Sequence, residues 1–147
     1  GFARGIAIER IYDPSLPMAY ADADQLVQVF QNLLKNAAEA LMLTPGKNGS
    51  GRIEIHTSYD GAMRLRDSIG AGIPLPLQIE IRDNGPGLPS EIAEDIFEPF
   101  VSGRENGTGL GLALVGKILS DNKAWITVRS KPGETVFRVS LPVAPKA

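Results

Sequence analysis

Three glycine- or proline-marked blocks lie between Asp83 and Leu112, and they constrain the fold more than any other feature of the sequence. They read D-N-G-P-G-L-P, I-F-E-P-F and G-T-G-L-G-L. The first block follows a run in which every second residue is apolar over positions 75–81, so the pattern predicts a strand that ends at Asp83. Gly85 and Gly87 then allow a turn and a close approach of the backbone. This block therefore predicts a carboxylate at a strand end beside a tight loop.

The third block opens a helical pattern whose apolar positions are Leu112, Val115, Ile118 and Leu119. Gly107, Gly109 and Gly111 then lie at a helix N-terminus, where free N–H groups can hold phosphate. The spacing differs from the G-x-G-x-x-G of dinucleotide sites, and the sequence has no Walker Gly-Lys-Ser/Thr. Between Phe100 and Gly107 the chain is polar, as expected of a lid that closes over a ligand. The three blocks together predict a nucleotide site.

A long helix is predicted to begin near Asp22, because Asp22 and Gln25 form an acid-type capping box. Its apolar face, which we expect in the core, consists of Leu26, Val29, Phe30, Leu33, Ala37, Ala40 and Leu41. A second face is polar and carries Gln25, Gln28, Asn32, Asn36 and Glu39. A solvated surface is the ordinary explanation of such a stripe. Two asparagines in mid-helix at i and i+4 are poor helix formers, however, and they favour a functional interpretation.

Length, charge and composition set the outer bounds. The 147 residues fit one domain, 1–147, with one core. Further strands are predicted at 5–11, 52–59, 124–130 and 135–141, so the fold class is α+β, a two-layer α/β sandwich in which helices pack on one face of a mixed sheet. The formal net charge of -2 gives no basic field for nucleic acid. With no cysteine and no apolar run of about 20 residues, we expect a cytoplasmic domain without membrane contact.

The order of these motifs resembles the catalytic ATP-binding domain of sensor histidine kinases, within the gyrase, Hsp90, histidine kinase and MutL fold. The stretch N-L-L-K-N-A at 32–37 matches the asparagine box of that family. The resemblance implies that Asn36 supplies an oxygen to Mg²⁺ on the nucleotide phosphates, and one amide suffices for a hard cation that phosphates also bind. It assigns Asp83 to the adenine amino group, with Gly85 and Gly87 beside it.

Phosphoryl transfer also requires that the charge of the γ-phosphate be neutralised. We expect Arg104 in the lid to act as a phosphate clamp, and Lys35 is a second, weaker candidate for the same charge role. Asn32 stands where ATP-hydrolysing relatives carry a glutamate that activates water, and an amide cannot act as that base. The other expected nucleotide contacts are Phe97, Gly107, Thr108, Gly109, Leu110, Gly111 and Thr135.

Nearly the whole chain resembles the nitrogen-regulation sensor kinases of the NtrB type. The long connection at 60–76, Y-D-P-S-L-P at 12–17 and the run at 100–112 carry this similarity. Two departures stand out. Asn122-Lys123-Ala124 replaces the usual His-Gly-Gly, and we expect Asn122 to take the left-handed cap conformation. Glu134 replaces a glycine just before Thr135.

The resemblance implies that the chain binds Mg-ATP and transfers the γ-phosphate to a histidine on its own upstream dimerisation domain. A response regulator and a nitrogen-signal regulator protein are the further partners it implies. His56 is interpreted as a strand-surface residue, because it lacks the helical H-E/D-x-x-x-P context of an acceptor. Two alternatives stay open at this point: an ATP-hydrolysing module of the gyrase or MutL kind, and a nucleotide-binding interaction module.

Overall fold

The computed structural model describes residues 5–42, 51–66, 70, 72–93, 95–98 and 110–146. In this part of the chain the main sheet has five strands in the order β1-β2-β5-β7-β6. They are β1 Ala7–Ile11, β2 Arg52–Tyr59, β5 Leu77–Asp83, β6 Trp125–Lys131 and β7 Glu134–Leu141. The helices are α1 Ala23–Met42, α2 Ser90–Ala93 and α3 Leu110–Asp121.

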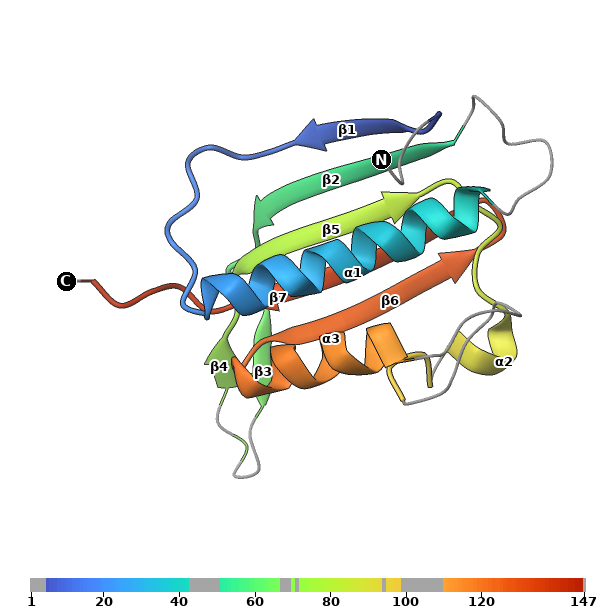
Figure 1. Cartoon of the computed structure of the whole chain (residues 1–147). Coiled ribbons are helices and arrows are strands. Elements are labelled where there is room, and N and C mark those ends of the chain that lie inside the picture. Colours follow the sequence, from blue (N-terminus) through green and yellow to red (C-terminus); the bar gives the residue numbers. More distant parts are fainter. Residues whose placement is uncertain are drawn as a thin grey trace.

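The sheet is mixed: β1 and β2 are parallel, and every other pair of neighbouring strands in the sheet is antiparallel. Figure 1 shows α1 and α3 side by side over one face of this sheet, with β1 at one edge and β6 at the other. Polar and charged residues alternate with apolar ones along the strands, so one face packs on the helices and the other stays uncovered by them. The predicted two-layer α+β fold with helices on one face is confirmed.

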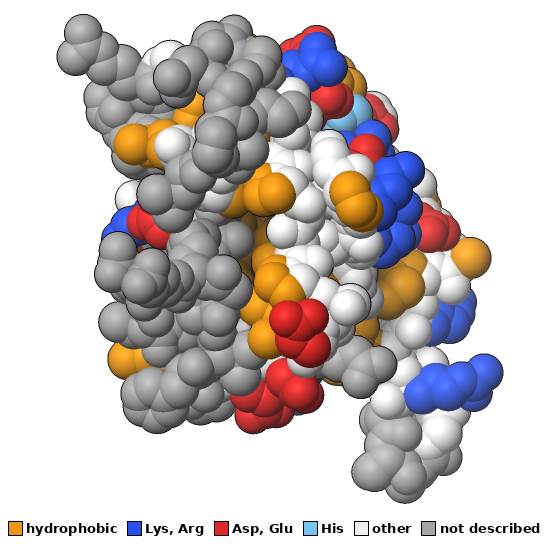
Figure 2. All heavy atoms as spheres, turned by 90° about the vertical axis from the view of Figure 1, so that its right-hand side faces the viewer, with side chains coloured by type: hydrophobic (Ala, Val, Ile, Leu, Met, Phe, Trp, Pro, Cys, Tyr) orange, Lys and Arg blue, Asp and Glu red, His pale blue; other side chains and the backbone are white. Residues whose placement is uncertain are grey.

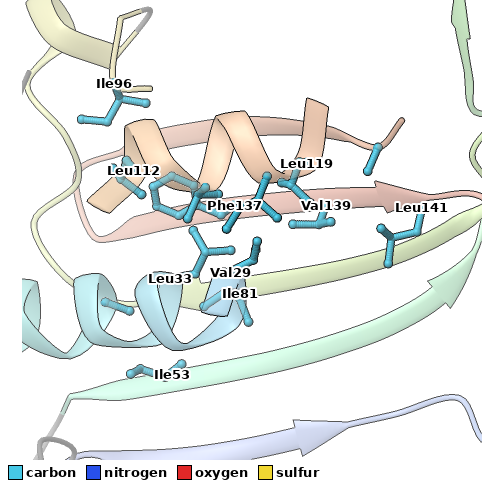
Figure 3. Close-up of a cluster of buried hydrophobic side chains, with 14 of the residues drawn as sticks. Val29, Leu33, Ile53, Ile81, Ile96, Leu112, Leu119, Phe137, Val139 and Leu141 are labelled. Atoms are coloured by element: carbon cyan, nitrogen blue, oxygen red, sulfur yellow. The ribbon is translucent and has the colours of Figure 1, made fainter. Parts of the chain in front are cut away.

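The core lies between the two helices and the sheet. Figure 3 shows Val29 and Leu33 from α1 and Leu112 and Leu119 from α3 directed toward Ile53, Ile81, Phe137, Val139 and Leu141 of the sheet. All of these side chains are buried. The predicted apolar face of α1 is confirmed, since Val29, Leu33, Ala37 and Leu41 are buried and Leu26 and Phe30 pack against them. Each large aliphatic side chain buried here contributes about 1.5–3 kcal/mol.

One half of the predicted Asp22–Gln25 capping box forms at the start of α1, and Asn122 takes the place of the Gln25 side chain in the other half. The backbone N–H of Gln25 donates to Oδ1 of Asp22 at 3.0 Å. The backbone N–H of Asp22 donates to Oδ1 of Asn122 at 2.9 Å, and Nδ2 of Asn122 donates to Oε1 of Gln25 at 2.9 Å. Asn122 therefore joins the end of α3 to the start of α1.

The expectation that Asn122 adopts the left-handed conformation is wrong, because Lys123 does so instead, with φ of 57°. The N–H of Ala124 donates to the carbonyl of Leu119 and that of Lys123 to Ser120, which is the Schellman pattern with Lys123 as the left-handed residue. Asn122 precedes that position, and its side chain is engaged with Asp22 and Gln25.

The long connection at 60–76 contains its own small antiparallel sheet of β3 Arg64–Arg66 and β4 Gly72–Pro74. Beside it, buried Gln78 donates to the carbonyl of Leu75 at 2.7 Å and accepts from the Ser140 hydroxyl at 2.7 Å. These bonds satisfy a polar side chain that burial would otherwise penalise. Across the described ranges, none of the helices combines the length and the hydropathy that crossing a bilayer requires.

Candidate functional site

Asp83 ends β5 as the sequence predicts, and its carboxylate lies at the buried end of the sheet. Its neighbours in register are Ile53 on β2 and Thr135 on β7, and Ile53 belongs to the core between sheet and helices. Asp83 is 5% exposed. Burial raises its pKa from 3.8 to about 6, because desolvation penalises the ionised acid; a hydrogen bond from the N–H of Gly85 to Oδ1, at 2.9 Å, opposes this. Within the described residues, the hydrogen bond from Gly85 engages one oxygen of this buried carboxylate, and the other oxygen can accept from a ligand donor.

Gly85 and Gly87 let the loop after β5 pass close to its surroundings. A β-carbon on Gly85 would stand 2.9 Å from Oδ1 of Asp83 and 3.8 Å from the β-carbon of Ala40 on α1. Gly87 has φ of +85°, and its β-carbon would come within 2.5 Å of the carbonyl oxygen of Lys131. Both positions therefore require glycine, one for proximity to Asp83 and one for backbone conformation and contact.

Sequence reasoning missed Ser130, which fixes this loop to the sheet. The N–H of Leu88 donates to Oγ of Ser130 at 2.6 Å, and that oxygen lies 3.3 Å from the hydroxyl of Thr135. The alternation of β6 could have identified Ser130. It follows Ile126 and Val128 on the inward-facing side of the strand, where a polar side chain is unusual. Thr135 is buried and is the register partner of Asp83, so the structure brings these two predicted residues together.

The other end of the site lies where α1 meets the start of α3. A β-carbon on Gly111 would stand 3.0 Å from Oδ1 of Asn32. The amide nitrogen of Asn32 donates to the carbonyl of Gln28, one turn earlier on α1, at 3.0 Å. The start of α3 at Gly111 and the asparagine stripe of α1 are thus in close contact.

Helix α1 connects the two ends of the site. Asn32, Asn36 and Ala40 are spaced four residues apart, so they follow one another along the helix surface, from the polar stripe to half-buried Ala40 at the border of the apolar face. Eight residues at 1.5 Å per residue separate Asn32 from Ala40 by about 12 Å along the axis. The Asp83 carboxylate lies near the Ala40 end and Gly111 at the Asn32 end, with half-buried Asn36 between them.

Three further predicted residues lie in the described part of the chain, and others fall outside it. The side chain of Lys35 is 67% exposed and pairs with Glu39 at 3.9 Å. Phe97 packs edge-on against Phe137, with ring centroids 6.0 Å apart, so its ring contributes to the core. Leu110 begins α3 and is exposed. The described residues do not include Phe100, Arg104, Gly107, Thr108 and Gly109.

His56 lies on the sheet face that the helices leave uncovered. Its Nε2 is 2.8 Å from Oε1 of Glu54, and its register partner on β5 is Glu80. Because side chains alternate along β2, His56 points away from the face on which Ile53 and Asp83 lie. This placement agrees with the interpretation of His56 as a residue of the strand surface.

The arrangement can bind a ligand that has a hydrogen-bond donor at one end and anionic groups at the other. The buried Asp83 carboxylate accepts the donor, and the N-terminus of α3 favours the negative charge. The described ranges contain no group of three or more histidine, cysteine or carboxylate residues suited to a metal ion. A cation bound at Asn36 therefore needs ligand oxygens besides the protein amide, which fits a metal–phosphate complex.

Comparison with known proteins identifies relatives of the whole chain. A family model described as histidine kinase-, DNA gyrase B- and HSP90-like ATPase matches residues 21–145. The sensory histidine kinase/phosphatase NtrB of Rhodobacter capsulatus is 60% identical over 146 residues, which cover 99% of this chain and 39% of that protein. NtrB of Rhizobium leguminosarum is 47% identical over 148 residues, covering 100% of this chain and 38% of the relative. The chain thus spans about two fifths of the length of these relatives.

Solved structures share the fold. The catalytic domain of histidine kinase ThkA superposes with a TM-score of 0.73 at 27% identity, covering 97% of this chain and 85% of that chain. Full-length ShkA in complex with AMPPNP superposes with a TM-score of 0.72 at 26% identity, covering 98% of this chain and 27% of that one. Both similarities extend over almost the entire chain.

Proposed function

The chain belongs to the histidine kinase-, DNA gyrase B- and HSP90-like ATPase family, and we propose that it is the ATP-binding catalytic domain of a nitrogen-regulation sensor histidine kinase. One observation carries the proposal: α1 brings the buried Asp83 carboxylate and the start of α3 to the two ends of one line of residues, Asn32, Asn36 and Ala40. The 60% identity to an NtrB protein supports the assignment to the nitrogen-regulation type.

Asp83 selects the base in this proposal. The N–H of Gly85 donates to Oδ1 of Asp83, and we propose that Oδ2 accepts a hydrogen bond from the amino group of adenine. Guanine presents a carbonyl at the corresponding position, and two acceptors facing each other in a buried site leave both without a donor. Thr135 on β7 is the register partner of Asp83, and the hydroxyl of Ser130 on β6 lies 3.3 Å from that of Thr135.

Asn36 and the N-terminus of α3 hold the phosphates and their Mg²⁺. We assign the metal ligand to the side-chain oxygen of Asn36 and the phosphate contacts to backbone N–H groups of Gly107–Gly111. Mg²⁺, when bound, neutralises charge on the phosphates. Lys35 can join this role, because an exposed pair such as Lys35–Glu39 contributes little and breaks at low cost. Arg104 is the proposed clamp from the lid.

The nucleophile is proposed to lie on another domain. Asn32 is an amide and cannot take a proton from water, which disfavours a hydrolysing module of the gyrase or MutL kind. His56 is on the opposite face of the sheet from Asp83. We therefore assign the acceptor to a histidine of an upstream dimerisation domain, from which the phosphoryl group passes to a response regulator. A nitrogen-signal protein is the proposed regulatory partner, and the cytoplasm the proposed location.

Phosphoryl transfer in trans tests this proposal. The 147-residue chain should bind Mg-ATP, hydrolyse it slowly and remain unlabelled by γ-³²P-ATP. Mixed with the upstream histidine-bearing part of the same protein, it should label that part, slowly because the tether is absent. Asn36→Ala should abolish labelling and the Mg²⁺ dependence of ATP binding, while Gln31→Ala, an exposed amide elsewhere on α1, should change neither. Rapid turnover that is insensitive to Asn36→Ala, or labelling that His56→Ala removes, would contradict the proposal.

A further inference from the structure

Three arginines converge on one glutamate on the sheet face that the helices leave uncovered. The Glu80 side chain on β5 is 10% exposed. Arg82 reaches its Oε1 with Nη2 at 2.5 Å and Nε at 3.1 Å. Arg138 on β7 and Arg129 on β6 approach Oε2 only to 3.6 Å and 3.7 Å. Figure 2 shows charged side chains gathered around the single histidine, along the side that corresponds to this face.

One carboxylate cannot form close hydrogen bonds with three guanidinium groups, and the distances show which two arginines lack such bonds to Glu80. Arg82 makes a forked contact within hydrogen-bond range, whereas Arg129 and Arg138 are beyond it. Nε of Arg138 is buried without a hydrogen-bond partner in the part of the chain that the structure describes. Three positive charges against one negative leave an excess of two at this point, although the chain as a whole carries -2.

The adjacent acid does not remove this excess. Glu54 is the register partner of Arg82, but its carboxylate is shared between His56 at 2.8 Å and Arg52 at 3.6 Å. The Arg129 side chain is 70% exposed, so its guanidinium group is accessible to a partner. Among the described residues, both arginines approach the same carboxylate only at 3.6–3.7 Å, and the Arg138 side chain is 37% exposed, so both guanidinium groups can bind a further carboxylate.

A large apolar side chain continues the same face. Trp125 on β6 is 46% exposed and points to the same side as Arg129, since residues at i and i+4 of a strand face alike. A hollow of about 620 Å³ reaches the β6 edge from the helix side, because its lining includes Leu119 of α3 and the inward-facing Ile126 and Val128; it is therefore separate from the face that carries Arg129. Tryptophan and arginine are the residues most enriched at the centres of protein interfaces. In the described chain β6 pairs with β7 only, so this face ends at an open sheet edge.

We propose that Arg82, Arg129, Arg138 and Trp125, here called the arginine face, dock an acidic segment of a partner protein. Carboxylates of that segment pair with Arg129 and Arg138, and an adjacent apolar side chain covers Trp125. Charge complementarity selects this occupant, because the face holds surplus guanidinium donors next to an exposed indole ring. The inference does not depend on the proposed kinase activity, since the nucleotide site lies on the opposite face of the sheet.

Fluorescence tests the proposal directly, because Trp125 is the single tryptophan of the chain. The probe is the peptide Ac-DSDSLSL-amide, which in extended form presents two carboxylates and two leucines on one side. Titrated into the 147-residue chain, it should shift the emission of Trp125 saturably, and the affinity should fall as salt rises. The amide twin Ac-NSNSLSL-amide should bind at least about tenfold more weakly, because it lacks the charge-assisted bonds.

Matched variants separate a docking surface from an internal ion network. Arg129→Gln with Arg138→Gln should weaken peptide binding about tenfold, whereas Lys117→Gln, an exposed cation on α3, should leave it within about twofold. Arg129→Gln alone serves as the variant least able to disturb folding, because its side chain is mostly exposed. Equal binding of both peptides, no effect of either arginine substitution, or tripolyphosphate binding as tightly as the acidic peptide would each overturn the proposal.

Discussion

The side-chain oxygen of Asn32 lies 3.0 Å from the point at which a β-carbon on Gly111 would stand. The two residues belong to α1 and α3, and their proximity joins the asparagine stripe to the glycine-rich start of the second helix. Close packing of this kind explains why position 111 has no side chain. It also makes position 111 a place where the nucleotide site can be perturbed without disturbing the core.

Gly111→Ala should weaken ATP binding by about 1–3 kcal/mol, because the added methyl group crowds Asn32 at the phosphate end of the site. The unfolding temperature should stay equal or rise slightly, since alanine is the better helix former by up to about 1 kcal/mol. Calorimetric titration with Mg-ATP and thermal unfolding measure the two effects separately.

Gly116→Ala is the matched control in the same helix. Its β-carbon would meet Phe97 at 3.5 Å, which is an ordinary van der Waals contact. We expect unchanged ATP affinity for this variant. A loss of affinity as large as that of Gly111→Ala would show that the effect is general to α3.

Asp83→Asn should stabilise the ligand-free domain at neutral pH. The folded-state pKa of about 6 exceeds the ordinary 3.8, so folding favours the protonated acid by about 3 kcal/mol. That contribution is complete below pH 3.8 and is lost as the pH rises through 6. The difference in unfolding free energy between variant and parent, measured by denaturant titration, should therefore grow in favour of the variant from pH 4 to pH 7.

The same substitution should weaken ATP binding at pH 7 by about 1–3 kcal/mol, because the amide is a poorer match for the adenine amino group. A variant that is more stable but binds ATP more weakly would show that Asp83 serves ligand binding and not the stability of the fold. If the variant is both less stable and unchanged in affinity, Asp83 serves the fold.

Gly87→Ala should destabilise the domain strongly, because two costs coincide there. The φ of +85° costs about 1–2 kcal/mol for a residue with a β-carbon, and contact with the Lys131 carbonyl at 2.5 Å adds about 1–3 kcal/mol. Gly133→Ala separates these costs, since Gly133 has φ of +89° but no atom within 4 Å of its β-carbon position. Chemical denaturation should show a clearly larger loss for Gly87→Ala; equal losses would mean that the contact at Lys131 relaxes freely.

Asn122→Ala should cost about 1–2 kcal/mol of unfolding free energy, because it removes the bonds to Asp22 and Gln25 that complete the α1 cap. Lys123→Gly, at the adjacent left-handed position, should gain about 1 kcal/mol. Lys123→Ala is its control: it removes the charge and keeps the strained conformation, so its stability should match the parent. Thermal unfolding of the three variants measures these differences.

Local rules suffice for much of the structure. Alternation predicts β2 at 52–59, capping places the start of α1 at Asp22, and a period of 3.6 predicts which face of α1 is buried. Gly87 follows partly from local chemistry, because its φ of +85° favours glycine, whereas its close approach to the Lys131 carbonyl does not. Each of these local features depends on residues within a few positions of one another, so the amino-acid sequence by itself determines them.

Tertiary structure decides which distant residues meet. Sheet register places Ser130 beside Thr135 and three arginines around Glu80, and helix packing sets Gly111 against Asn32. The turn after α3 is a second example of a feature that local sequence does not determine. The Asn122 side chain bonds to the start of α1, which is distant in the chain. Lys123, and not Asn122, adopts the left-handed conformation. Such contacts follow from strand pairing and helix docking over the whole domain, which no local propensity encodes.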